Sequence, residues 1–121
     1  MNMLSARLHG YLDIVTVVVF FLAPFLFGLG GYVAAVAWAL AAVHLVMTLL
    51  TRFPMGVVKI IPFPVHGIIE LVVGIVLVLA MPRLLLAGPG SPARTFFTAA
   101  GVVILAVWAF TGYRAADVEK S

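Results

Sequence analysis

His9-Gly10-Tyr11-Leu12-Asp13 returns later in the chain as His66-Gly67-Ile68-Ile69-Glu70, and each copy opens a long apolar stretch. In both copies the histidine precedes the acid by four residues, so the two side chains share one face of a helix. These two acids are the only ones in the apolar part of the chain. Because a charge inside a bilayer is costly and is kept for a purpose, the duplicated pattern predicts both the architecture and the candidate site.

The composition identifies an integral membrane protein. Of 121 residues, 65% are hydrophobic and only 9% are charged, whereas soluble domains are about 25% charged. A membrane-spanning helix needs about 20 apolar residues, so this length allows four spans and leaves no room for a soluble catalytic domain. The chain has no cysteine, which excludes thiolate sites. Its few basic residues are scattered, which argues against nucleic-acid binding.

Four apolar stretches, at about 8–27, 32–50, 66–87 and 95–113, are separated by turn-forming residues. Helices are the only structure that so few spans can form in lipid, where open sheet edges are excluded. We therefore expect an all-α integral membrane four-helix bundle built from two tandem transmembrane hairpins. It would form one membrane domain over residues 1–121, with repeat one at about 8–51, a linker at 52–65, repeat two at about 66–113 and a tail at 114–121.

The distribution of basic residues predicts the orientation. The N-terminus, the linker and the tail hold Arg7, Arg52, Lys59, Arg114 and Lys120, and the two hairpin loops hold Arg83 and Arg94. Basic residues are more frequent on the cytoplasmic side. We expect a multi-pass protein of the cell's inner (plasma) membrane with both termini in the cytoplasm.

The linker contains an apolar run, residues 57–61, between prolines. It is predicted either to lie in the membrane interface, with Lys59 reaching water or lipid phosphate, or to form a plain apolar loop packed on the bundle.

The two halves align beyond the opening pattern. After short slips in register, Pro24 pairs with Pro82 and Thr51 pairs with Thr111. Two spans per half preserve orientation, so the halves are parallel repeats related by a pseudo-two-fold axis along the membrane normal. This axis would place both His–acid pairs at one depth, near the cytoplasmic end, where the four side chains can converge.

Two further stretches carry a family resemblance. The first is Ala23-Pro24-Phe25-Leu26-Phe27-Gly28, which follows the first His–acid pair, and the second is the linker from Thr51 to Pro62. With the His–acid pairs, they resemble the SPW-repeat membrane proteins over roughly residues 9–88. The Ser-Pro-Trp motif itself reads Ala23-Pro24-Phe25 and Met81-Pro82-Arg83 here. The resemblance implies a small multi-span bacterial or archaeal membrane protein with tandem hairpins, and it implies no established activity.

The cluster of His9, Asp13, His66 and Glu70 allows three kinds of chemistry. As a hydrogen-bonded clamp, Asp13 would accept from His66 and Glu70 from His9, holding the first and third spans together. Two imidazoles and two carboxylates can also bind a divalent metal such as zinc, manganese or iron. Since histidine titrates near neutral pH, a proton or cation pathway is the third alternative.

His44 lies alone within the second span, and Ile104 or a neighbour occupies the matching place in the second half. An intramembrane histidine can ligate a haem-type cofactor. It more often donates a hydrogen bond to a carbonyl or to a partner helix.

Small residues predict where helices pack closely. We expect such packing at the glycines that follow the two histidines and along a stripe of small residues in the second span: Gly10, Gly67, Gly31, Ala35 and Ala39. The stripe would serve the internal bundle, which we favour, or contact with a second copy.

Pro24 and Pro82 fall in the last turns of the first and third spans. Proline removes a backbone donor and bends a helix, so both positions are candidate helix bends. Ordinary helix termination before a glycine-containing loop is the alternative that we favour.

The sequence therefore favours a structural or accessory membrane subunit over an enzyme. No nucleophile with a base, phosphate loop or dinucleotide motif is present, and we expect no cofactor. Its expected partners are the lipid bilayer and a second copy or a larger membrane complex. The alternatives are a protein that binds a divalent metal or a haem-type cofactor, and a proton or cation pathway.

Overall fold

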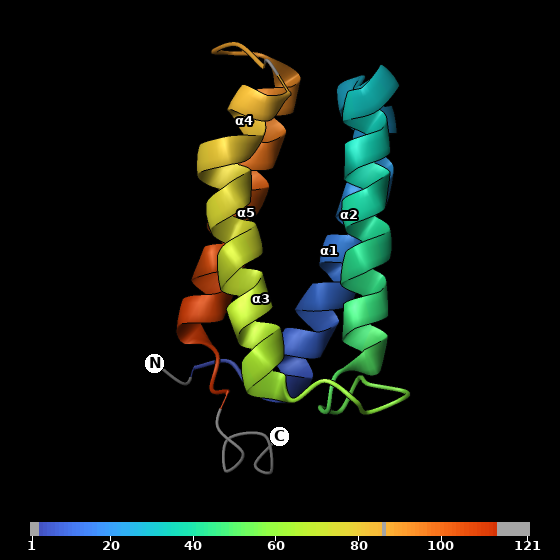
Figure 1. The fold of residues 1–121 in the computed structure, drawn as a ribbon, viewed down its shortest axis with the longest axis vertical. Helices are drawn as coiled ribbons and strands as arrows, with labels where there is room; N and C mark the ends of the chain where they lie inside the picture. The colour runs from blue at the N-terminus through green and yellow to red at the C-terminus, as the bar shows by residue number, and fades with distance from the viewer. Residues whose placement is uncertain (1–2, 86, 114–121) are drawn as a thin grey trace.

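A computed structural model describes residues 3–85 and 87–113. Two helical hairpins stand side by side (Figure 1). Their elements are α1 (Ala6–Phe27) and α2 (Gly31–Leu50), then α3 (Phe63–Ile75), the π-helical η1 (Val76–Ala80), α4 (Met81–Leu84) and α5 (Pro92–Phe110). The segments α3, η1 and α4 form one rod, and all four rods are long and apolar enough to cross a membrane. The predicted all-α bundle is confirmed, and the predicted tail at 114–121 lies outside the described residues.

The predicted boundaries of the second hairpin are shifted. The third rod begins at Phe63 instead of His66, since Pro64 is tolerated in the first turn of a helix, where its missing N–H has no helical partner. The fourth rod covers Pro92–Phe110 instead of 95–113. Its start is fixed by Ser91, whose side chain accepts a hydrogen bond from the Arg94 N–H as an N-cap.

The two prolines within the rods have different surroundings. Pro24 is buried inside α1, which continues to Phe27 and ends at Gly28 in the left-handed conformation, with φ 65°. Pro82 follows η1, a π-helical segment. A proline cannot donate to the carbonyl four residues before it, and a wide π turn accommodates that loss.

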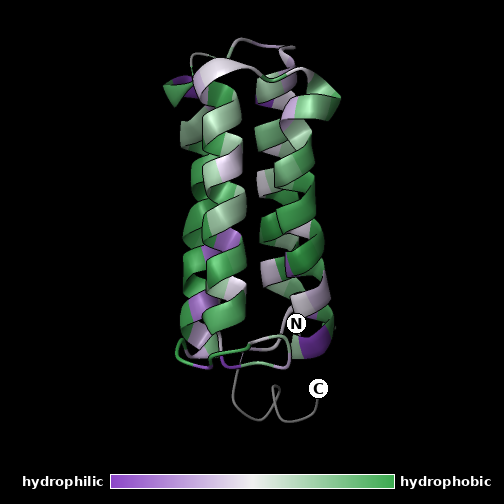
Figure 2. Cartoon of the chain, turned by 90° about the vertical axis from the view of Figure 1, so that its right-hand side faces the viewer, coloured by the Kyte–Doolittle hydropathy of each residue, from purple (hydrophilic) through white to green (hydrophobic). Residues whose placement is uncertain are grey.

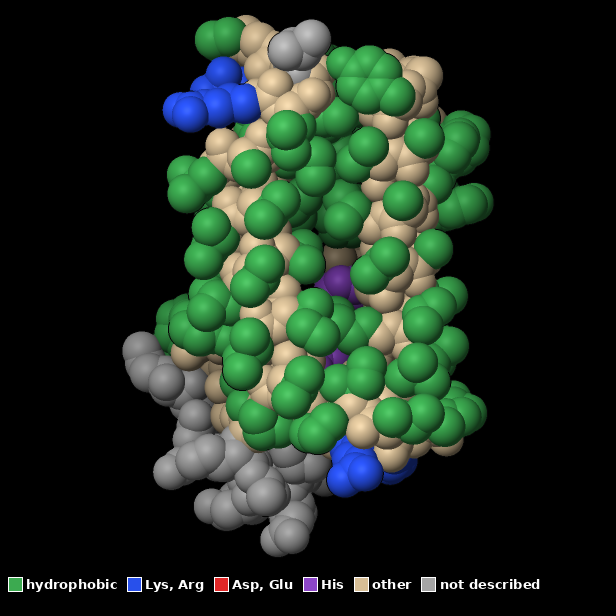
Figure 3. Space-filling model, viewed as in Figure 1, with side chains coloured by type: hydrophobic (Ala, Val, Ile, Leu, Met, Phe, Trp, Pro, Cys, Tyr) green, Lys and Arg blue, Asp and Glu red, His purple; other side chains and the backbone are tan. Residues whose placement is uncertain are grey.

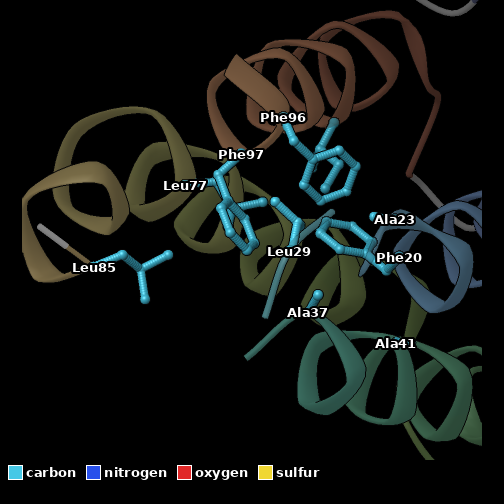
Figure 4. Close-up of a cluster of buried hydrophobic side chains, with 10 residues drawn as sticks. Phe20, Ala23, Leu29, Ala37, Ala41, Leu77, Leu85, Phe96 and Phe97 are labelled. Carbon is cyan, nitrogen blue, oxygen red and sulfur yellow. The ribbon is translucent and has the colours of Figure 1, made fainter. Parts of the chain in front are cut away.

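Buried hydrophobic side chains from all four rods form one apolar core (Figure 4). The rings of Phe20 and Phe96 meet edge to face with centroids 5.3 Å apart. The buried members are Phe20, Ala23, Leu29, Ala37, Ala41, Leu77, Leu85, Phe96, Phe97 and Ile104.

Hydrophobic residues predominate along all the rods (Figure 2), and many of the large ones are exposed. On the face shown in Figure 3, the visible Lys and Arg side chains lie only at the two ends. Leu26, at 69% exposed, and Leu79, at 66%, are examples of large apolar side chains on the outside. Apolar patches of this extent are unfavourable in water, and lipid is the solvent that suits them. The finding supports a multi-pass membrane protein.

The expected use of the α2 stripe within the bundle is wrong, because Gly31, Ala35 and Ala39 are all exposed; packing against a second copy stays a prediction. The buried face of this helix instead carries Ala34, Ala37, Ala41, His44 and Thr48. Alanine is so frequent here that small-residue spacing fits more than one face. The polar pair His44 and Thr48 decides between the faces, because in lipid these groups must be turned inward to find partners.

Backbone hydrogen bonds at one end of the bundle follow the internal repeat. Leu4 N–H donates to the Phe110 carbonyl at 2.8 Å, and at the equivalent position Ile61 N–H donates to the Leu50 carbonyl at 2.7 Å. The chain before each hairpin thus pairs with the end of the other hairpin. This arrangement supports parallel repeats and closes the end of the bundle that contains the polar site.

Candidate metal centre

Four polar side chains meet between the hairpins, two from α1 and two from α3. His9 and His66 are 0% exposed, and Asp13 and Glu70 are 2% exposed. Nε2 of His9 lies 2.9 Å from Glu70 Oε2 and 3.2 Å from Asp13 Oδ1. Nε2 of His66 lies 3.0 Å from Glu70 Oε1 and 3.1 Å from Asp13 Oδ2. Each imidazole therefore faces both carboxylates, and the four residues form a closed ring that joins the two hairpins.

The glycines beside the histidines allow other chain segments to cover this ring. A Cβ on Gly10 would collide with the Met55 side chain, and a Cβ on Gly67 would lie 2.8 Å from the Tyr113 ring. Close approach at both positions was predicted. The covering groups, however, come from the linker and from the chain after α5, and not from a neighbouring helix.

Two threonine hydroxyls contact the Nδ1 atoms of the two histidines, whereas the Nε2 atoms face the carboxylates. His66 Nδ1 lies 2.7 Å from Thr51 Oγ1, and His9 Nδ1 lies 2.9 Å from Thr111 Oγ1. Each threonine hydroxyl donates its own proton to the carbonyl four residues earlier, at Met47 and Val107. A hydroxyl has one proton to donate, so each can only accept from its histidine. Both Nδ1 atoms are therefore protonated.

This protonation determines what the inner nitrogens can do. With the proton on Nδ1, a neutral imidazole presents a bare lone pair at Nε2. A lone pair can bond to a carboxylate only across an added proton or a cation, as at His66 Nε2 and Glu70 Oε1, which lie 3.0 Å apart in hydrogen-bonding geometry. Two ionised carboxylates bring two negative charges into the buried site. Two added protons or one divalent cation would balance these charges.

The positions of the inner atoms suit a cation. His9 Nε2 and Asp13 Oδ2 are buried and have no partner in hydrogen-bonding geometry, although His9 Nε2 lies 2.9 Å from Glu70 Oε2 and Asp13 Oδ2 lies 3.1 Å from His66 Nε2. With metal–ligand bonds of about 2.1 Å, neighbouring ligand atoms lie about 3.0 Å apart at right angles and about 3.4 Å apart at tetrahedral angles. The four ring distances run from 2.9 to 3.2 Å. One ligand atom from each of the four residues lies within 4.8 Å of all the others.

His44 also reaches the ring and contacts a partner helix, which is the alternative that the sequence favoured over a cofactor. Its Nε2 lies 3.3 Å from Asp13 Oδ1 and 3.6 Å from Glu70 Oε1. The cavity beside these three residues has a volume of about 10 Å³, room for about one water molecule. It cannot hold a porphyrin, so the geometry does not support a haem at His44.

Aromatic side chains enclose the ring on the side toward the end of the bundle where the linker lies. The rings of Phe53 and Phe63 lie with centroids 5.4 and 5.7 Å from that of His66. The Tyr113 hydroxyl donates to Glu70 Oε2 at 3.3 Å. Burial and the nearby Glu70 carboxylate raise the pKa of Tyr113, so its hydroxyl keeps the proton that it donates.

Sequence reasoning found the four central residues and missed the groups that position them. Thr51 and Thr111 were matched in the repeat alignment, and their equivalence was the available signal. Each ends the second span of its half, and each contacts the histidine of the other half. No comparable signal marked Tyr113, whose role depends on how the chain turns after α5.

No protein-family model, curated protein or solved structure matches this chain. Membership of the SPW-repeat family therefore stays a prediction.

Proposed function

We propose that this chain is a small integral membrane protein that binds one divalent transition-metal ion between its two hairpins. The observation that carries the proposal is the buried ring itself, in which two imidazoles and two carboxylates each offer one ligand atom within 4.8 Å of the others. The threonine hydroxyls at the two Nδ1 atoms leave the Nε2 atoms to face the carboxylates. Second-shell bonds of this kind fix the tautomer and orientation of metal-ligating histidines. Two added protons would turn the same groups into a hydrogen-bonded clamp, and the experiment below separates the clamp from a bound ion.

The ligand set favours Mn²⁺ or Fe²⁺. Imidazole and carboxylate ligands suit several first-row metals, whereas zinc prefers four tetrahedral ligands. Both oxygens of each carboxylate face a histidine nitrogen at 2.9–3.2 Å, so the four residues offer up to six ligand atoms, as in six-coordinate geometry. His44 Nε2, which lies 3.3 Å from Asp13 Oδ1, is one further nitrogen close to this set.

The ion would act mainly as a cross-link. Each hairpin contributes one histidine and one acid, so a bound ion ties α1 to α3 at one end of the bundle. We propose the role of a structural or accessory subunit without catalytic activity of its own. We do not propose a proton or cation pathway, since buried Phe20, Leu77 and Phe97 fill the bundle beyond the ring.

Elemental analysis of the protein purified in detergent tests this proposal. The protein is stripped with chelator, reloaded with Mn²⁺ or Fe²⁺ and desalted. We expect one ion per chain in the native protein and none in the Asp13→Asn/Glu70→Gln variant, which keeps the shapes but removes both charges. Arg83→Gln, at the opposite end of the bundle, is the control and should keep one ion.

The same variants separate metal binding from the hydrogen-bonded clamp. If the ion is the cross-link, metal raises the midpoint of thermal unfolding of the native protein and leaves that of the double variant unchanged. A native protein that retains none of the metals offered, and whose unfolding midpoint does not respond to them, would overturn the proposal in favour of the clamp.

A further inference from the structure

A second polar feature lies at the same end of the bundle, outside the ring. Arg7, in the first turn of α1, and Arg52 and Lys59, in the linker, line a cavity of about 550 Å³ together with Phe53 and Pro54. All three basic residues are exposed. Three cations from separate parts of the chain thus converge on one open pocket.

This pocket has no anion of its own among the described residues. In residues 3–85 and 87–113 the only acids are Asp13 and Glu70, and both are buried against histidines. Arg52 is partly fixed, because its Nε donates to the Lys59 carbonyl at 3.1 Å. This bond uses one of the five N–H donors of a guanidinium, and the flat fork of donors matches the oxygens of a phosphate.

The apolar residues around Lys59 indicate how deep in the membrane the pocket would lie. Val57 is 75% exposed, Val58 52% and Ile60 58%. Hydrogen bonds from the linker to the Leu49 and Leu50 carbonyls hold this segment against the end of α2. In a membrane, such side chains enter the boundary between headgroups and acyl chains while the basic groups stay at the phosphates.

We propose that this pocket binds the headgroup of one anionic phospholipid, with its phosphate held by Arg7, Arg52 and Lys59. A zwitterionic headgroup would bring its own cation among these three, so the pocket should select lipids with net negative charge. The acyl chains would run along the apolar side chains of the linker. This site does not depend on the metal, although Phe53 lies between the two.

Native mass spectrometry of the detergent-solubilised protein, titrated with phosphatidylglycerol or phosphatidylcholine, tests the proposal. We expect the native protein to keep one phosphatidylglycerol at concentrations where phosphatidylcholine is lost. Near a membrane each basic residue changes affinity about fivefold, so Arg7→Gln/Lys59→Gln should weaken phosphatidylglycerol binding by roughly 25-fold. Arg83→Gln/Arg94→Gln removes two exposed cations from the opposite end and is the matched control.

Three results would overturn the proposal. They are equal retention of the two lipids, equal losses in the test and control pairs, and displacement of phosphatidylglycerol by millimolar inorganic phosphate, which would indicate a site for a soluble anion. Arg52→Lys keeps the charge but loses the guanidinium fork, and we expect it to weaken binding less than Arg7→Gln/Lys59→Gln. Metal content should be the same in all these variants, which separates this site from the ring.

Discussion

Replacement of Thr51 by valine tests whether the threonine–histidine pairing serves metal binding. The substitution keeps the shape of the side chain and removes the hydroxyl that accepts from His66 Nδ1. Thr51 is 0% exposed, so no water replaces the lost acceptor. His66 would then be free to rotate or to move its proton to Nε2, the atom that faces the carboxylates.

The expected loss follows from the role of such outer contacts. Removing a second-shell partner of a metal-ligating histidine lowers metal affinity by about 10- to 100-fold. That factor corresponds to about 1.4 to 2.7 kcal/mol of binding free energy, and it agrees with a cost of about 1–3 kcal/mol for leaving a buried donor unpaired. Thr111→Val should behave alike, because Thr111 makes the same contact with His9.

The chain provides a closely matched control in Thr48. This residue is on the same helix, is also 0% exposed, and donates its hydroxyl proton to the carbonyl of His44, four residues earlier, at 2.8 Å. Unlike Thr51, it has no bond to a histidine side chain among the contacts described. Thr48→Val therefore removes the same back-bond to the helix without touching the ring.

The assay is competition between the folded, detergent-solubilised protein and a chelator of known affinity, with Mn²⁺ as the probe. We expect Thr51→Val to lose 10- to 100-fold in affinity and Thr48→Val to stay within about threefold of the native protein. Equal affinities in the two variants would refute the idea that threonine fixes the histidine for metal binding.

Two further substitutions probe the surroundings of the ring. His44→Gln removes a nitrogen 3.3 Å from Asp13 Oδ1; it should lower Mn²⁺ affinity in the chelator assay but leave one ion per chain, and complete loss of the ion would mean that His44 is an essential ligand. Gly67→Ala puts a methyl group 2.8 Å from the Tyr113 ring and should lower the free energy of unfolding by about 1–3 kcal/mol, measured by denaturant titration in detergent. Its control is Gly88→Ala, where a Cβ would meet nothing within 4 Å, and equal losses in both would contradict close packing at Gly67.

The sequence predicts the fold of this chain well because membrane solvation leaves few choices. Long apolar stretches in lipid must be helical, and the repeated His–acid pattern relates the two hairpins. The spacing of small residues predicts helix packing less well than apolar length predicts the helices. On α2, alanines lie on both faces, and the spacing of Gly31, Ala35 and Ala39 fits a face that the structure turns outward.

The centre of the site could be predicted for a similar reason, and its periphery could not. Buried acids in a bilayer need partners, so Asp13 and Glu70 had to meet the histidines one turn away. The position of His44 depends on how α2 is rotated about its axis. His44 and Thr48 indicate which face of α2 turns inward, but the sequence does not indicate which groups of the other helices this face meets.

The two halves of the chain differ beside the ring, so the ring has different surroundings on the side of α2 and on the side of α5. Repeat one carries His44 where repeat two carries Ile104, and both residues line the small cavity beside Asp13 and Glu70. The ring itself is nearly symmetric, with the same histidine, acid and threonine from each half. A third nitrogen therefore reaches the centre from α2 only, while α5 presents a buried apolar side chain at the matching place. A bound ion would meet this single-water cavity on one side and fully packed protein on the other.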